Sequence, residues 1–132
     1  WGCPSMNELS RNGNDVSRWN LLNPAEKPKL SHVEQCLNDT RGPVIAATDY
    51  VRLYSEQIRP FVNRRYVTLG TDGFGRSDTR EKLRHFFEVN RYWVTLAALK
   101  ALADDGEIDR SKVAEAILKY GIDTNKPNPM SV

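Results

Sequence analysis

The residues best suited to chemistry lie in a glycine-rich stretch, residues 70–78, with the sequence GTDGFGRSD. The four residues before it, YVTL at 66–69, predict a short buried strand. Asp78 followed by Glu81 matches a capping box, which predicts a helix start directly behind the loop. Backbone amides at a helix N-terminus attract anions, so this arrangement could hold a phosphate or a carboxylate.

The order of the glycines does not match the known phosphate loops. It is G-x-x-G-x-G, whereas dinucleotide sites use G-x-G-x-x-G and P-loops use G-x-x-x-x-G-K-[ST]. Glycines also occur in tight turns because they lack a Cβ atom and adopt positive φ without steric cost. Two interpretations therefore stay open, a structural strand-to-helix turn, which the motif favours, and an anion-binding loop.

Charged residues around the loop could make contacts with a ligand or a partner. Arg80 and Arg84 fall on one face of the predicted helix, where they could clamp an anion or form an interdomain ion pair. Neither His32 nor His85 has a nucleophile at a recognisable spacing, and Ser77 lacks a G-x-S-x-G elbow. We predict no catalytic, cofactor-binding or metal-binding residue. The predicted interface or anion contacts are Asp72, Arg76, Ser77, Arg80 and His85.

Metal and redox chemistry have little support in the sequence. Asp72, Asp78 and Glu81 could suggest a magnesium site, but helix capping already accounts for the last two. Cys3 and Cys36 are far apart and lack the spacing of a metal or redox motif. We expect free, buried or half-buried thiols in a reducing compartment.

Composition describes a globular chain. Its 132 residues are 39% hydrophobic and 27% charged, which is enough for one domain with a core. The net charge of +2 is spread along the chain without a basic stripe, so nucleic-acid binding has no support. The chain contains neither a membrane-length apolar run nor a signal-peptide pattern, and we therefore expect a cytoplasmic protein that does not bind membranes.

The loop must be positioned by a βαβ unit. Residues 44–47, VIAA, form an apolar run typical of a strand buried on both faces of a parallel sheet. Thr48 or Asp49 would cap the next helix, whose apolar face starts at Val51 and which Pro60 stops. The strand at 66–69 then completes the unit.

Helices are expected on both sides of this unit. Upstream, the sequence predicts two short helices, 6–11 and 15–22, followed by a proline-containing connector at 23–28. Ser31 with Glu34 predicts a capping box on another short helix. Three helical stretches follow the glycine loop, at 79–87, 91–103 and 110–120. The second of them has few polar residues and should be central and buried, and the third carries Asp109 at its start and Gly121 at its end.

Three segments together resemble a known family. The stretch 70–89, GTDGFGRSDTREKLRHFFEV, with VIAATDY at 44–50 and GEIDRSKVAEAI at 106–117, resembles the C-terminal region of the homodimeric, thiamine-dependent pyruvate dehydrogenases. The loop core is shared more loosely with transketolase-like C-terminal domains. The likeness extends over essentially the whole chain.

This resemblance implies an α/β, three-layer fold with a mostly parallel sheet whose first strands precede Trp1. Residues 1–132 would be one C-terminal domain of a longer chain, with an extended tail at 123–132. In the family, thiamine diphosphate and magnesium are held by the preceding domains, so no residue here is assigned to them. The implied partners are the remaining domains, the second subunit of a homodimer and the dihydrolipoyl acetyltransferase core.

Two functions follow as hypotheses. The first is an assembly domain of an enzyme that oxidatively decarboxylates pyruvate and transfers the acetyl group to lipoyl groups, with no catalysis by this fragment alone. The glycine loop would then lie at an interdomain or intersubunit contact. The alternative is a regulatory module that binds an anion or nucleotide through residues 70–78. A free-standing enzyme is disfavoured because no nucleophile–base pair can be assembled.

Overall fold

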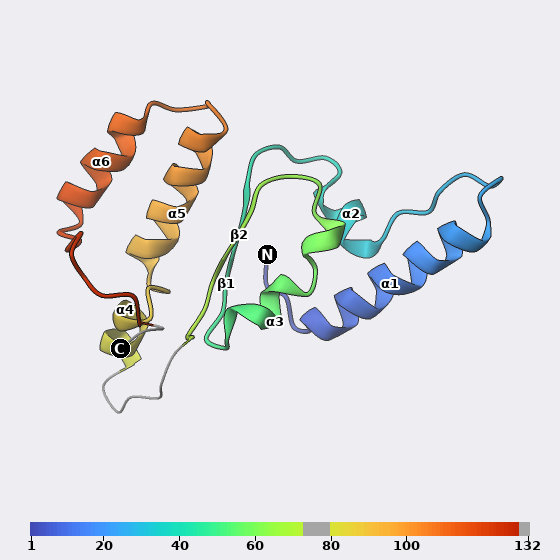
Figure 1. Ribbon diagram of the computed structural model, residues 1–132, viewed down its shortest axis with the longest axis horizontal. Helices are drawn as coiled ribbons and strands as arrows, with labels where there is room; N and C mark the ends of the chain where they lie inside the picture. Colours follow the sequence, from blue (N-terminus) through green and yellow to red (C-terminus); the bar gives the residue numbers. More distant parts are fainter. Residues whose placement is uncertain (73–79, 130–132) are drawn as a thin grey trace.

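The computed structural model describes residues 1–72 and 80–129, except for the side chains of Arg80, Glu81 and Arg84. Its centre is a parallel sheet of two strands, β1 (Val44–Ala47) and β2 (Tyr66–Leu69), with Val44 paired to Tyr66. Figure 1 shows helices on both sides of this sheet, with α3 (Arg52–Glu56) on one side and α5 (Arg91–Asp104) on the other. The α/β class is confirmed.

Successive side chains of β2 point to opposite faces of the sheet. The hydroxyl groups of Tyr66 and Thr68 both reach α3, whereas Val67 lines a hollow shared with α5. The predicted burial of 44–47 on both faces is wrong, because this strand is half-buried and Ala47 is exposed. Its two faces are covered unevenly by the described helices.

The first helix, α1 (Met6–Leu22), is continuous, and the prediction of two short helices is wrong. Ser5 begins it by accepting a hydrogen bond from the Glu8 amide at 3.2 Å. Gly13, which falls in the gap between the two predicted helices, is buried in the interior of α1. A Cβ atom there would lie 2.4 Å from the Phe61 ring. Gly13 is therefore explained by close packing and not by a turn.

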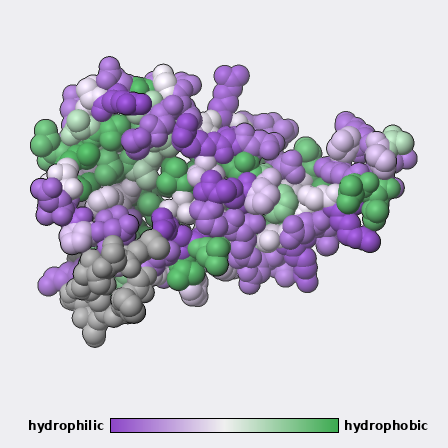
Figure 2. All heavy atoms as spheres, in the orientation of Figure 1, coloured by the Kyte–Doolittle hydropathy of each residue, from purple (hydrophilic) through white to green (hydrophobic). Residues whose placement is uncertain are grey.

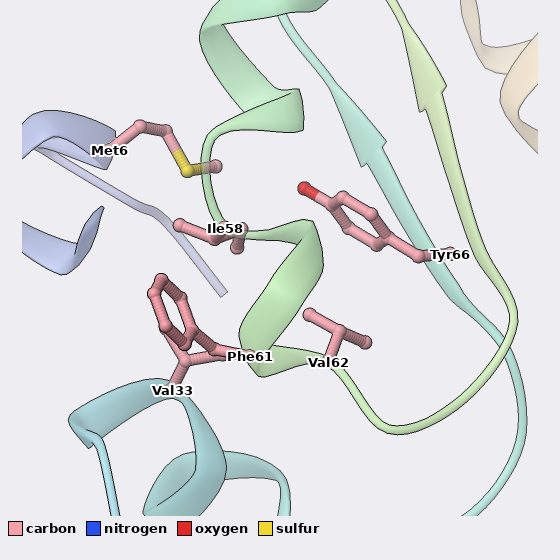
Figure 3. Close-up of a cluster of buried hydrophobic side chains, with 6 residues drawn as sticks. All are labelled: Met6, Val33, Ile58, Phe61, Val62 and Tyr66. Atoms are coloured by element: carbon pink, nitrogen blue, oxygen red, sulfur yellow. The ribbon is translucent and has the colours of Figure 1, made fainter. Parts of the chain in front are cut away.

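Side chains from distant segments form a core on the α3 side of the sheet. Figure 3 shows this cluster, in which α1, α2 (His32–Leu37), β2 and the 3₁₀ helix η1 (Arg59–Phe61) take part. Its buried members are Met6, Val33, Ile58, Phe61, Val62 and Tyr66. Helix α2 starts at the predicted capping box, since Ser31 and Glu34 each accept a hydrogen bond from the other's amide.

Helix α3 begins differently from the prediction. Its N-cap is Val51, which makes no side-chain cap bond, and Thr48 accepts a hydrogen bond from the Tyr50 amide instead. The prediction that Thr48 or Asp49 caps the helix is therefore wrong. The prediction that Pro60 ends this helix is also wrong, because α3 ends at Glu56 and Pro60 lies within η1.

The predicted helices after the glycine loop are present as α4 (Arg80–Phe86), α5 and α6 (Arg110–Lys119). Asp109 accepts a hydrogen bond from the Ser111 amide at 2.9 Å, and Gly121 has a φ of +63° at the end of α6. The expectation that α5 is well buried is wrong. Only Ala101 and Ala103 are buried on it, and its other apolar side chains are half-exposed.

A lysine of the C-terminal tail contacts the junction of α4 and α5. Lys126 donates hydrogen bonds to the Phe86 carbonyl at 2.8 Å and to a Glu88 carboxylate oxygen at 3.3 Å. Glu88 has a φ of +64°, in the left-handed region that a side chain disfavours. These contacts hold the tail against this bend.

Two sequence-level expectations concern the surface. Cys3 and Cys36 are free as predicted, but both are exposed and not buried or half-buried. Within residues 1–72 and 80–129, none of the helices has the length and apolar character needed to cross a bilayer.

Candidate functional site

The carboxyl ends of the two parallel strands are the place where α/β proteins usually bind ligands. Here the loops after β1 and β2 are joined by hydrogen bonds. The Thr48 amide donates to the Leu69 carbonyl at 3.0 Å, and the Thr71 amide donates to the Tyr50 carbonyl at 2.8 Å. The Thr71 hydroxyl also donates to the Asp49 carbonyl at 2.6 Å. The start of the glycine loop is thus fixed to the neighbouring loop.

Gly70 is required by this close approach. It is buried, and a Cβ atom at its position would lie 2.6 Å from the Arg52 backbone nitrogen and 2.7 Å from the Tyr50 carbonyl oxygen. Neither backbone atom can move away as a flexible side chain could. The first glycine of the loop therefore has a structural role.

Asp72, one of the predicted interface or anion contacts, interacts within the chain. One of its carboxylate oxygens accepts a hydrogen bond from the Arg52 amide at 2.6 Å, and the other lies 3.4 Å from Arg52 Nε. A carboxylate at the first residue of a helix complements the free amides there. Asp72 therefore supplies the cap that the residues before α3 do not, and it ties the loop to this helix.

Of the other predicted interface or anion contacts, the structure describes only Arg80 and His85. Arg76 and Ser77 lie outside the described residues, as does the predicted cap Asp78. Arg80 is the first residue of α4. His85 is exposed on α4, where its Nδ1 lies 3.1 Å from the side-chain nitrogen of Asn90.

Asn90 connects His85 to the next helix. It is the N-cap of α5, since its side-chain oxygen accepts a hydrogen bond from the Trp93 amide at 3.1 Å. His85 therefore lies at the α4–α5 junction, while Asp72 lies at the sheet edge. Asp72 contacts the start of α3, whereas His85 contacts the N-cap of α5.

A polar cluster that sequence reasoning missed covers the α3 face of β2. Glu56 accepts two hydrogen bonds from Arg59, at 2.5 and 2.9 Å, and one from the Thr68 hydroxyl at 2.7 Å. The Arg59 hydrogen bonds are the main cause that lowers the pKa of Glu56 to about 2, against a usual 4.5. The i, i+3 spacing of Glu56 and Arg59 could have indicated their pairing, but nothing local indicates Thr68.

Tyr66 adjoins the same cluster. Burial raises its pKa to about 12, and its hydroxyl donates to the Ser55 carbonyl at 2.7 Å. A carboxyl with a pKa near 2 and a phenol with a pKa near 12 do not exchange protons readily at neutral pH. The cluster is therefore suited to holding α3 on the sheet and not to acid–base catalysis.

A second missed feature is a hollow of about 510 Å³ between β2 and α5. Its lining includes basic side chains, but these have acceptors. Arg65 pairs with Asp105 at 2.6 Å and Lys100 with Asp104 at 2.6 Å. Arg64 donates to the Leu37 carbonyl at the end of α2. The positive charges of the hollow are thus largely engaged inside the chain.

Metal-ligating side chains are dispersed over the part of the chain that the structure describes. Within that part, no three His, Cys, Asp or Glu residues gather around one point. The described residues therefore do not fit a magnesium–diphosphate group, whose ion requires several oxygen ligands.

A parallel sheet with helices on both faces places the protein in the α/β class. The loops at the carboxyl edge of this sheet are held together by hydrogen bonds. Residues 1–90 match the transketolase-like TK C-terminal domain, and the chain belongs to this family. The resemblance predicted from its motifs is confirmed.

The most informative similarities are to pyruvate dehydrogenase E1 components. The chain is 75% identical over all of its 132 residues to the E1 component of Cupriavidus necator. Identity is 63% over 131 residues to that of Pseudomonas aeruginosa and 52% over 130 residues to that of Escherichia coli K12, with 98% of the chain covered in each case. The chain spans about 15% of the length of these relatives.

Proposed function

We propose that this chain is the C-terminal assembly domain of a pyruvate dehydrogenase E1 polypeptide. The observation that carries the proposal is the 75% identity, over the entire chain, to a protein named as that component. The polypeptide would oxidatively decarboxylate pyruvate and pass the acetyl group to lipoyl groups. It would work in the cytoplasm as a homodimer, bound to a dihydrolipoyl acetyltransferase core.

The chemistry of the described residues supports a structural part in that enzyme. The pKa shifts of Glu56 and Tyr66 move both groups away from neutral pH, and Asp72 is already engaged by Arg52. The proposal therefore assigns thiamine diphosphate, magnesium and the reacting groups to the rest of the polypeptide. Thiamine diphosphate, when bound there, would supply the carbanion chemistry that decarboxylation requires.

The glycine loop has a defined position in this proposal. Its first residues, Gly70, Thr71 and Asp72, are fixed to the sheet edge and to the start of α3. Arg76, Ser77, Arg80 and His85 would then face a neighbouring domain or subunit. The anion-binding alternative is not supported, because the described start of the loop presents a carboxylate already paired within the chain.

The test uses the full-length polypeptide that carries this chain. Arg76→Ala and Arg80→Ala are each compared with Lys119→Ala, a matched change of an exposed cation on α6. We expect the two arginine variants to weaken subunit association in analytical ultracentrifugation and to reduce pyruvate decarboxylation, while Lys119→Ala changes neither. Unchanged association and activity in both arginine variants would contradict an interface role for the loop.

A truncation separates the general role from the role of the loop. Removal of residues 1–132 from the full-length polypeptide should abolish assembly and activity together. A truncated polypeptide that still dimerises and decarboxylates pyruvate would overturn the assembly function itself. Calorimetric titration with inorganic phosphate and with ADP checks the alternative, and we expect no heat of binding at millimolar ligand.

A further inference from the structure

Three exposed leucines, which we call the leucine tip, lie at the end of α1 or in the connector that follows it: Leu21, Leu22 and Leu30. These residues are 76%, 58% and 45% exposed, respectively. In Figure 1 the end of α1 and the loop behind it lie far from the sheet, and Figure 2 shows a hydrophobic group at that end of the molecule. Single exposed apolar residues are common on proteins, but grouped ones often mark a contact surface.

Hydrogen bonds hold the leucine tip in shape. The Asn20 side chain accepts from the Lys29 amide at 2.8 Å and donates to the Lys29 carbonyl at 3.0 Å. These bonds hold the connector against the last turn of α1, and Leu30 directly follows the bonded Lys29. The Lys29 ammonium also lies 3.9 Å from the centre of the Trp19 ring.

The same segment is fixed at the helix end. Asn23 donates to the Trp19 carbonyl through its backbone nitrogen at 3.0 Å and its side chain at 2.9 Å. A surface held in one conformation loses little entropy when it is covered, which favours binding. The leucine tip is thus both apolar and preorganised.

The domain's own core does not use these leucines. The buried residues of α1 are Met6 and Gly13, which lie in the earlier part of the helix and pack toward η1. Leu21, Leu22 and Leu30 are absent from the core cluster and from the partly buried residues around it. Packing within the described residues therefore does not explain these leucines.

We propose that the leucine tip docks into an apolar surface on another domain of the same polypeptide. This rests on the proposed function, because the relatives extend far beyond the 15% that this chain spans. A domain in the same polypeptide is present at high effective concentration and competes well with a second copy of this chain. Interdomain contacts of ordinary size need only a small apolar centre of this kind.

Site-specific photo-crosslinking in the full-length polypeptide tests the proposal. A benzophenone amino acid replaces Leu21, and in a matched control it replaces Leu118, which is 82% exposed on α6. Light and heavy isotope-labelled polypeptides are mixed, reassembled and irradiated, so that mass spectrometry distinguishes bonds within one polypeptide from bonds between two. We expect the Leu21 probe to give crosslinks to residues outside 1–132 of its own polypeptide and the Leu118 probe to give few.

Two results would overturn the proposal. One is a set of Leu21 crosslinks only between two polypeptides, which would make a second subunit the occupant. The other is a crosslinking yield from the Leu21 probe no higher than that from the Leu118 probe, which would mean that the leucine tip stays exposed to solvent. Neither result would contradict the proposed assembly function, which is tested separately by removal of residues 1–132 from the full-length polypeptide.

A double variant gives an independent readout. Leu21→Asn with Leu22→Asn should speed amide hydrogen exchange in the crosslinked partner segment by about tenfold or more, because the apolar burial of two leucines is lost. Leu118→Asn should leave that segment unchanged. Since all three leucines are exposed in this domain, the variants should keep its thermal unfolding temperature. Unchanged exchange in the double variant would count against the docking.

Discussion

The two sides of the sheet are built differently. On the α3 side, large side chains from α1, α2, η1 and β2 pack together, and a carboxylate with three hydrogen bonds lies beside them. On the α5 side, the buried residues of α5 and α6 are small, and a hollow of about 510 Å³ is edged by ion pairs. Stability should therefore depend much more on the first side than on the second.

The largest effect is expected from Phe61→Ala, on the α3 side. Phe61 is 7% exposed and belongs to the core cluster. Removal of its ring should lower the free energy of unfolding by about 3–5 kcal/mol. Urea unfolding followed by circular dichroism measures this, with Leu118→Ala as the exposed control that should change little. A loss below about 1 kcal/mol would remove the contrast between the two sides.

The next largest effect on the free energy of unfolding is expected from Gly13→Ala. In an exposed helix interior this change stabilises by about 1 kcal/mol. Here the new methyl group would meet the Phe61 ring at 2.4 Å, so we expect a loss of about 1–3 kcal/mol from overpacking. The double variant with Phe61→Leu should recover part of that loss. A stabilised Gly13→Ala protein would show that α1 and η1 pack less closely than described.

Glu56 should make the α3 side sensitive to acid. The folded-state pKa of about 2 lies below the usual 4.5, so its stabilising contribution is complete above pH 4.5 and is lost as the pH falls toward 2. Glu56→Gln should cost about 1–2 kcal/mol at pH 7. Urea unfolding at pH 7, 4 and 2.5 should show the difference between wild type and variant shrinking with pH. A constant difference would contradict the sign of this pKa shift.

The smallest effect is expected from the ion pairs on the α5 side. Arg65→Ala and Lys100→Ala each remove a cation from an exposed pair in which salt and side-chain entropy limit the gain. Each variant should lower the thermal unfolding temperature less than Glu56→Gln does, and 1 M NaCl should reduce the difference from wild type further. A shift larger than that of Glu56→Gln would reverse the ranking of the two sides.

Much of the fold followed from local patterns. Strands 44–47 and 66–69 have the predicted bounds, and the Ser31 and Asp109 caps make the predicted hydrogen bonds. These features depend on residues a few positions apart, so a single sequence contains the whole signal.

The candidate site was less predictable. Asp72 caps a helix that begins 20 residues before it, and Thr68 bonds to a carboxylate 12 residues away. Both contacts exist only because β1 and β2 lie side by side and bring their following loops together. A local pattern points only to residues near the helix start, which is why it predicts Thr48 or Asp49 as the cap of α3.

The amino-acid sequence alone predicted the family, the two strands, the approximate bounds of the last three helices and the caps at Ser31 and Asp109, because motifs and short-range hydrogen bonds need no knowledge of distant segments. Only the tertiary structure decided that Gly13 and Gly70 serve close approach, that Asp72 is held by Arg52, and that the leucine tip faces outward. The physical reason is that steric fit and burial are properties of segments that meet in space. A glycine that must avoid a ring and a glycine that forms a turn have the same letter in the sequence.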